Sequence, residues 1–157
     1  MLERFSRFSF AISEIYRCWH KLAAEELAKY GLSSAHTIYL NILYNSPEGI
    51  TAAKLGELSG KDKADVSRMV AILEKKGMLE KQATGGNMYR ALLMLTEQGR
   101  EAARHVQERA AVAVELAGAG LSESDRKIFY YALEQITNNL QTLCKEGLPE
   151  NRKRDGL

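Results

Sequence analysis

Residues 61–77 read KDKADVSRMVAILEKKG, and this stretch carries two patterns at once. An apolar stripe recurs at helical spacing and predicts a helix with one face in a core: Val66, Met69, Val70 and Leu73. The opposite side of a helical wheel holds Ala64, Arg68, Ala71 and Lys75, with Lys61 and Ser67 at its margins. A solvated helix face usually carries long charged side chains of both signs. Small residues between cations instead let the backbone approach something bulky and anionic.

The composition is that of a soluble globular protein of 157 residues, with 45% hydrophobic and 27% charged residues. A net charge of +2 is too small to indicate a nucleic-acid partner by itself. However, residues 51–90 hold eight cations and five anions, which places a mild basic focus on the stretch quoted above. The chain start lacks the apolar region of a signal peptide and no run is long enough to span a membrane, so we expect a cytoplasmic protein without a membrane partner.

The remaining sequence predicts a mainly helical chain with one hairpin. The predicted helices cover about residues 2–29, 33–45, 51–60, 61–77, 96–117 and 122–144, and two extended segments around the Gly85-Gly86 pair form the hairpin. Ser33, Thr51 and the Ser122/Asp125 pair are expected at helix starts, and Gly60 and Gly77 at helix ends.

This order of elements is that of a winged helix-turn-helix. The expected contacts between the two turn helices come from Leu55, Leu58, Val66, Val70 and Leu73. The outward face of the second turn helix would then enter a DNA major groove, which is about 12 Å wide and admits one α-helix. The predicted fold is therefore mainly α, with a small β-hairpin wing and with long helices before and after the winged domain.

Two segments resemble the MarR family of bacterial regulators, named for multiple antibiotic resistance. LGELSGKDKADVSRMVAILEKKGML is similar to the family's short leucine-rich helix and recognition helix, and LMLTEQG to its L-T-x-x-G after the wing. The resemblance covers roughly residues 5–143. It implies a homodimer that represses transcription, with relief by a small molecule or an oxidant in many members. It also implies a helical dimerisation region over 1–30 and 97–145 and a DNA-binding domain over 31–96. The sequence EGLPENRKRDGL predicts a flexible tail over 146–157.

Candidate DNA contacts fall in two groups. The recognition helix contributes Lys61, Lys63, Ala64, Asp65, Ser67 and Arg68, and the wing and backbone contacts are Thr51, Lys81 and Arg90. Asp65 either accepts from a cytosine amino group or pairs with Arg68, and Arg68 either contacts DNA or serves as a buried structural ion-pair partner. We expect a pseudo-palindromic operator, because a two-fold dimer presents its recognition helices about 34–36 Å apart.

The wing departs from the family pattern. Members commonly carry Asp-x-Arg near the wing tip, whereas alignment from LMLTEQG places Asn87, Met88 and Tyr89 there. This departure supports an alternative function: a winged protein-interaction module with weak or lost DNA binding. Apolar sectors that a small winged domain cannot cover, including Phe5, Phe8, Trp19 and Phe129, predict the homodimer independently of the resemblance.

Other residues suggest regulation. Trp19, His20, His36 and Tyr39 either line an effector pocket for a small molecule or form an ordinary packed aromatic cluster. Cys18 is either a redox sensor or a packed thiol on a dimerisation helix.

The same residue types argue against a metal, a cofactor or catalysis. The lone His105 lacks the clustered ligands of a metal sensor. No catalytic arrangement at a credible spacing predicts an enzyme, and no cofactor is expected.

Overall fold

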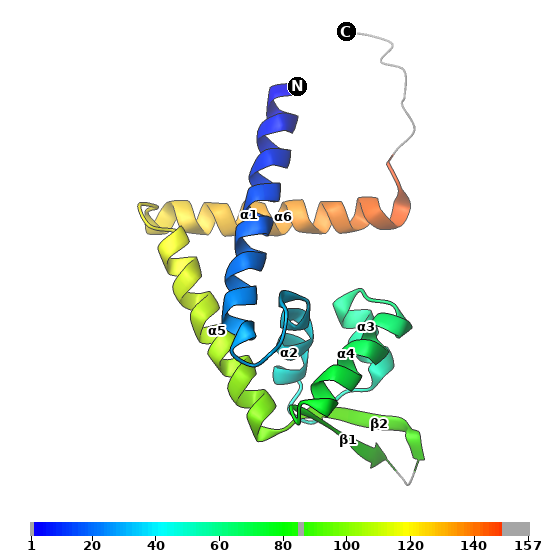
Figure 1. The fold of residues 1–157 in the computed structure, drawn as a ribbon. Coiled ribbons are helices and arrows are strands. Elements are labelled where there is room, and N and C mark those ends of the chain that lie inside the picture. The colour runs from blue at the N-terminus through cyan, green and yellow to red at the C-terminus, as the bar shows by residue number, and fades with distance from the viewer. Residues whose placement is uncertain (1, 85–86, 149–157) are drawn as a thin grey trace. The chain divides into compact units, whose positions relative to one another are not determined.

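The computed structural model describes residues 2–84 and 87–148, and their side chains except those of 2, 5, 84 and 87–90 (Figure 1). Its helices are α1 (Leu2–Ala28), a 3₁₀ turn η1 (Ser34–His36), α2 (Thr37–Tyr44), α3 (Ala52–Ser59), α4 (Lys63–Lys75), α5 (Glu97–Ala117) and α6 (Glu123–Glu146), and its strands are β1 (Leu79–Thr84) and β2 (Asn87–Leu95). The predicted fold class, mainly α with a two-stranded hairpin, is confirmed. The expectations for Phe5, the wing-tip side chains, Arg90 and residues 149–157 lie outside the described residues.

The chain forms two compact units, Met1–Ala113 and Val114–Leu157. Within the described residues, no helix is long and apolar enough to cross a membrane.

Side-chain caps and glycines set most helix ends where the sequence predicts them. The Thr51 hydroxyl accepts from the backbone N–H of Lys54 at 3.2 Å and starts α3, and Ser122 accepts from the N–H of Asp125 at 3.2 Å and starts α6. Gly60 ends α3 at φ 65°, a left-handed conformation that glycine adopts without steric cost.

The predicted helix over 33–45 is a 3₁₀ turn followed by α2. The Nδ1 atom of His36 accepts from the backbone N–H of Ser33 at 3.1 Å, which tightens the first turn.

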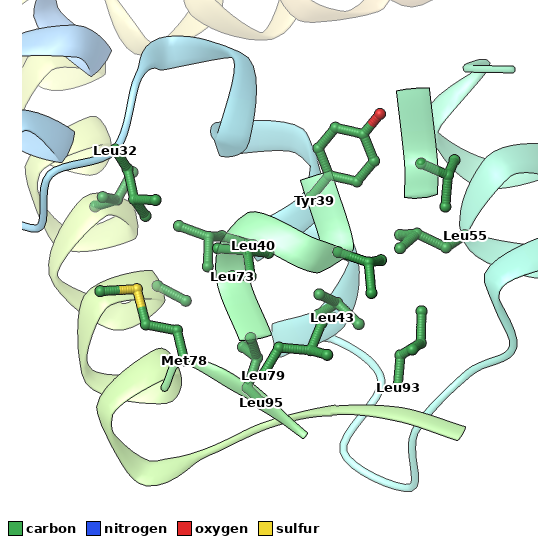
Figure 2. Close-up of a cluster of buried hydrophobic side chains, with 14 of the residues drawn as sticks. Leu32, Tyr39, Leu40, Leu43, Leu55, Leu73, Met78, Leu79, Leu93 and Leu95 are labelled. Carbon is green, nitrogen blue, oxygen red and sulfur yellow. The ribbon is translucent and has the colours of Figure 1, made fainter. Parts of the chain in front are cut away.

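The core of the first unit gathers side chains from α2, α3, α4 and the hairpin (Figure 2). Its fully buried members include Tyr39, Leu40, Leu43, Leu55, Leu73, Met78 and Leu95. Because α4 contributes Val66, Val70 and Leu73 to this core, one face of the helix is fixed inward.

The prediction for Leu58 is wrong. Leu55 is fully buried, but Leu58 is 50% exposed. The buried row of α3 instead runs from Leu55 to Ser59, one helical turn away, and the Ser59 hydroxyl is satisfied by the carbonyl of Gly56 at 3.3 Å. Leu58 is therefore not part of the buried core between the two turn helices.

The hairpin is antiparallel and leads directly into α5. Leu79 pairs with Leu95, and Ile50 adds a short bridge to Leu93. Thr96 joins the end of the hairpin to the loop after α4: its N–H donates to the Met78 carbonyl at 3.1 Å and its hydroxyl to the Gly77 carbonyl at 2.7 Å.

Gly99, in the first turn of α5, lies close to the same loop. Its N–H donates to the Thr96 hydroxyl at 3.2 Å. A Cβ at Gly99 would lie 2.0 Å from the Met78 carbonyl oxygen, so a side chain there is excluded.

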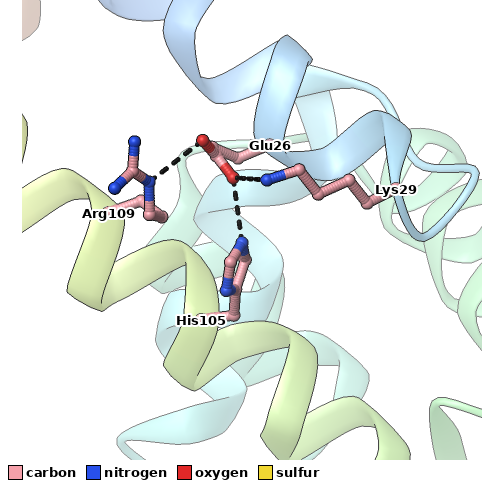
Figure 3. Close-up of polar contacts among 4 residues, drawn as sticks. All are labelled: Glu26, Lys29, His105 and Arg109. Carbon is pink, nitrogen blue, oxygen red and sulfur yellow. Dashed lines mark hydrogen bonds and ion pairs between the residues drawn. The ribbon is translucent and has the colours of Figure 1, made fainter.

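An ion cluster fastens the end of α1 to α5 (Figure 3). The Glu26 carboxylate accepts from Lys29 Nζ at 2.5 Å, from His105 Nε2 at 2.9 Å and from Arg109 Nε at 3.1 Å. Lys29 above all, together with His105 and Arg109, lowers the pKa of Glu26 from its usual 4.5 to about 2. His105 therefore has a structural partner on α1.

We expect the Leu55→Ala variant to lose about 2–5 kcal/mol of unfolding free energy, because it leaves a cavity in the core. The matched Leu58→Ala variant should change the unfolding free energy by less than about 0.5 kcal/mol, as is usual for surface positions. Urea denaturation of both variants checks this difference. Equal losses in the two variants would contradict the orientation of α3.

We expect a Glu26→Gln variant to be less stable than the wild type near neutral pH, because it loses its ion pairs. The folded pKa of Glu26 lies below its usual value, so the stabilisation is complete above about pH 4.5 and disappears as the pH falls toward 2. Thermal melts should therefore show a Tm difference that shrinks between about pH 5 and pH 2. The control is Glu25→Gln at the exposed neighbouring position, and its Tm should stay close to that of the wild type at every pH. A Tm difference for Glu26→Gln that does not change with pH would refute the link between the pKa of Glu26 and the stability of the fold.

Candidate nucleic-acid interface

The outer face of α4 is exposed while its inner face is buried, as the sequence predicts. Val66, Val70 and Leu73 are at most 5% exposed. The exposed residues on and just before the helix include Lys61, Lys63, Ala64, Ser67, Arg68, Ala71 and Lys75. This face combines cations, one hydroxyl and small side chains.

The N-terminus of α4 has two lysines beside its capping carboxylate. The Asp62 carboxylate accepts from the backbone N–H of Asp65 at 2.8 Å and caps the helix. Lys61 and Lys63 flank the cap, and no described carboxylate lies within 4.0 Å of either amine. Free cations beside a helix N-terminus form a favourable environment for a phosphate group.

Asp65 connects the exposed face to the core. Its Oδ2 atom accepts from the Tyr39 hydroxyl at 3.0 Å, and its Oδ1 atom accepts from Arg68 Nη2 at 3.2 Å. The Tyr39 hydroxyl, and then Arg68, lower the pKa of Asp65. Burial and the Asp65 carboxylate raise the pKa of Tyr39 to about 12, which keeps the phenol protonated. Of these three hydrogen-bonded residues, Arg68 is the exposed one: 66% of its side chain is accessible, so it is not a buried ion-pair partner.

The candidate contacts outside α4 have different local roles. Thr51 caps α3 through its hydroxyl. Lys81, on β1, forms an ion pair with Glu74 of α4 at 2.6 Å. Arg90 has no described side chain. Of these three positions, Lys81 holds the wing against α4.

The four residues considered for an effector pocket lie in two different environments. Trp19 is 39% exposed on α1, where the rings of His20 and Tyr16 lie with centroids 4.1 Å apart and planes tilted by 44°. His36 and Tyr39 are buried in η1 and α2. Among the described residues, no hydrogen bond or aromatic ring contact joins any two of the four.

The cysteines and histidines form no metal cluster in the described part of the chain. Cys18 and Cys144 are both free and exposed, and Arg17 Nη2 lies 3.7 Å from the Cys18 sulfur.

The turn before α4, its exposed cationic face and the hairpin after it define a winged helix-turn-helix protein. Residues 30–87 match the sequence model of the MarR family. The structure of a MarR family transcription regulator has a TM-score of 0.81 and 17% identity to this protein, covering 92% of this chain and 95% of that one. The chain thus has the winged-helix fold of MarR family structures, and its residues 30–87 match the sequence model of that family, which confirms the resemblance seen in its motifs.

Two further solved structures have the same fold. A MarR transcriptional regulator from Methanosarcina mazei Go1 has a TM-score of 0.77 at 22% identity, over 88% of this chain and 99% of that one. A MarR family regulator from Listeria monocytogenes, in complex with a 26-mer DNA, has a TM-score of 0.72 at 24% identity, over 88% and 94%. No curated protein matches this chain by sequence.

Proposed function

We propose that the protein is a homodimeric transcriptional regulator that binds a pseudo-palindromic DNA site through the outer face of α4. The observation that carries the proposal is the two-sided character of this helix, whose apolar row is buried while its cations face solvent. The Listeria structure in complex with a 26-mer DNA supports DNA as the partner of this chain.

The residues of α4 suit separate parts of a DNA site. Ala64 and Ala71 are small enough to bring the helix backbone close to the groove floor. Arg68 has donors in a fixed fork and matches the two acceptors on guanine. Lys61 and Lys63, beside the helix N-terminus, suit phosphates and would position the helix without reading sequence.

Exposed apolar side chains support the dimer. None of the described residues of α6 is buried, although the helix carries Phe129, Leu133, Ile136, Leu140 and Leu143. On α1, the exposed apolar residues include Phe8, Phe10, Ile12, Ile15 and Trp19. Apolar surface of this extent marks a protein partner, and a two-fold homodimer is the most common closed assembly.

The same dimer provides a route to regulation. Residues 1–30 and 97–145 would form the dimer, while residues 31–96 would bind DNA. A small-molecule effector that prefers one dimer geometry would lower DNA affinity by its difference in affinity for the two geometries. Repression relieved by such an effector, in the cytoplasm, is the function that we propose.

Substituting Arg68 by Ala should weaken binding to the selected operator by about 1–3 kcal/mol if the side chain reads a guanine. Substituting Lys61 by Ala should instead weaken binding to all duplexes alike and reduce the salt slope by about one. Anisotropy titrations on a site selected from random DNA measure both effects. Arg104→Ala, which truncates a cation on α5, is the control and should leave affinity and slope unchanged.

The wild-type titration also tests the alternative. A winged protein-interaction module should show little salt-dependent affinity for random duplex DNA. That result would reject the regulator and favour the interaction module. An Arg68→Ala variant with unchanged operator affinity would reject the role of Arg68 alone.

A Leu140→Glu variant should convert the dimer into monomers, because it places a charge in the apolar face of α6. Asn138→Glu adds the same charge to another face of α6 and should leave the dimer intact. Sedimentation equilibrium measures the mass of both variants. A monomeric wild-type protein at micromolar concentration would refute the proposed assembly.

A further inference from the structure

We propose that Tyr39 and Asp65 are positioning residues that hold Arg68 ready to read a base. This inference rests on the proposed function and deepens it. It assigns part of the DNA specificity to a tyrosine in the protein core, which would not itself touch DNA.

The contacts form a continuous chain from the core to the surface. Tyr39 is 1% exposed, and its ring packs in the cluster formed by α2, α3 and α4. Its hydroxyl donates to one oxygen of Asp65 at 3.0 Å, and the other oxygen accepts from Arg68 at 3.2 Å. Arg68 is thereby connected to an immobile group through a single carboxylate.

A fixed arginine binds a base better than a mobile one. A free arginine loses considerable rotamer freedom when it binds, which reduces its contribution to affinity. Asp65 accepts its hydrogen bond from Nη2, one of the two terminal nitrogens of the Arg68 guanidinium group. Other N–H donors of Arg68 therefore remain for a guanine. The pair therefore reduces the ordering cost and leaves donors available.

The position of Asp65 argues for this role over direct base contact. Only 25% of its side chain is exposed, against 66% for Arg68, so the arginine is the more accessible group. In addition, a carboxylate that faced the groove without a partner would repel phosphates. Both oxygens of Asp65 instead accept hydrogen bonds from within the protein, which makes its charge compatible with this face.

The inference separates specificity from general affinity. The specificity ratio is the affinity for the selected operator divided by the affinity for the same site with the Arg68-dependent base pair replaced. Comparing the wild type with Arg68→Ala on operators that carry single base-pair changes identifies that base pair. In Tyr39→Phe, we expect the ratio to fall about 3- to 10-fold, the size of one hydrogen bond, while the affinity for random duplex and its salt slope stay unchanged.

Tyr44→Phe is the matched control. Tyr44 lies on the same helix, is half-buried against the same core, and its hydroxyl has no hydrogen-bond partner among the described side chains. The same atom is removed, so its specificity ratio should equal that of the wild type. Circular dichroism melts confirm that both variants are folded at the titration temperature.

A double-mutant cycle tests the connection through Arg68. In an Arg68→Ala background, Tyr39→Phe should have no further effect on the ratio. Asp65→Asn, which keeps the shape of the side chain but removes its charge, should lower the ratio as Tyr39→Phe does. It also serves as the test if Tyr39→Phe does not fold.

The outcomes distinguish the inference from the function on which it rests. If the wild type shows no salt-dependent binding, both the proposed function and the positioning role of Tyr39 and Asp65 are rejected. If the operator is bound and the specificity ratio is equal for the wild type and Tyr39→Phe, only the positioning role of Tyr39 and Asp65 is rejected. A loss that persists in the Arg68→Ala background would also overturn it, since Asp65 would then act on DNA directly.

Discussion

The packing of α4 against the core determines which residues of this helix face solvent. Burying Val66, Val70 and Leu73 stabilises the fold by about 1.5–3 kcal/mol for each side chain. Exposed ion pairs such as Arg68–Asp65 contribute about 0–1 kcal/mol. The apolar row therefore sets the rotation of α4 about its axis, and the outward direction of Lys63 and Arg68 follows from it.

Local features of the sequence predicted the elements well. Caps such as Thr51 and Ser122 act within three residues, and Gly60 ends α3 through its own backbone conformation. The orientation of Leu58 could not be predicted in the same way. Leu58 and Ser59 lie three and four residues after Leu55, so both are on nearly the same side of this short helix. Which of the two is buried depends on how α3 packs in the folded unit, and the structure buries Ser59.

The candidate site was predictable in part. The outward residues of α4 follow from its period of 3.6, since burying one face exposes the other. The contact between Tyr39 and Asp65 joins residues 26 positions apart, and neither residue type indicates such a partner in the sequence. The link between Lys81 and Glu74 likewise depends on how the hairpin folds back on α4. Tyr39, considered for an effector pocket, is placed by the structure in the core.

The junction at Thr96 and Gly99 has a mechanical consequence. The first turn of α5 touches the carbonyl of Met78 so closely that no side chain fits between them. Thr96 donates hydrogen bonds to the carbonyls of Gly77 and Met78, and its hydroxyl accepts one from the N–H of Gly99. These contacts leave little room for movement between the start of α5 and the loop after α4. Any tilt at the start of α5 must either carry residues 77–78 with it or break these bonds, so the first turn of α5 and the loop that follows α4 move together.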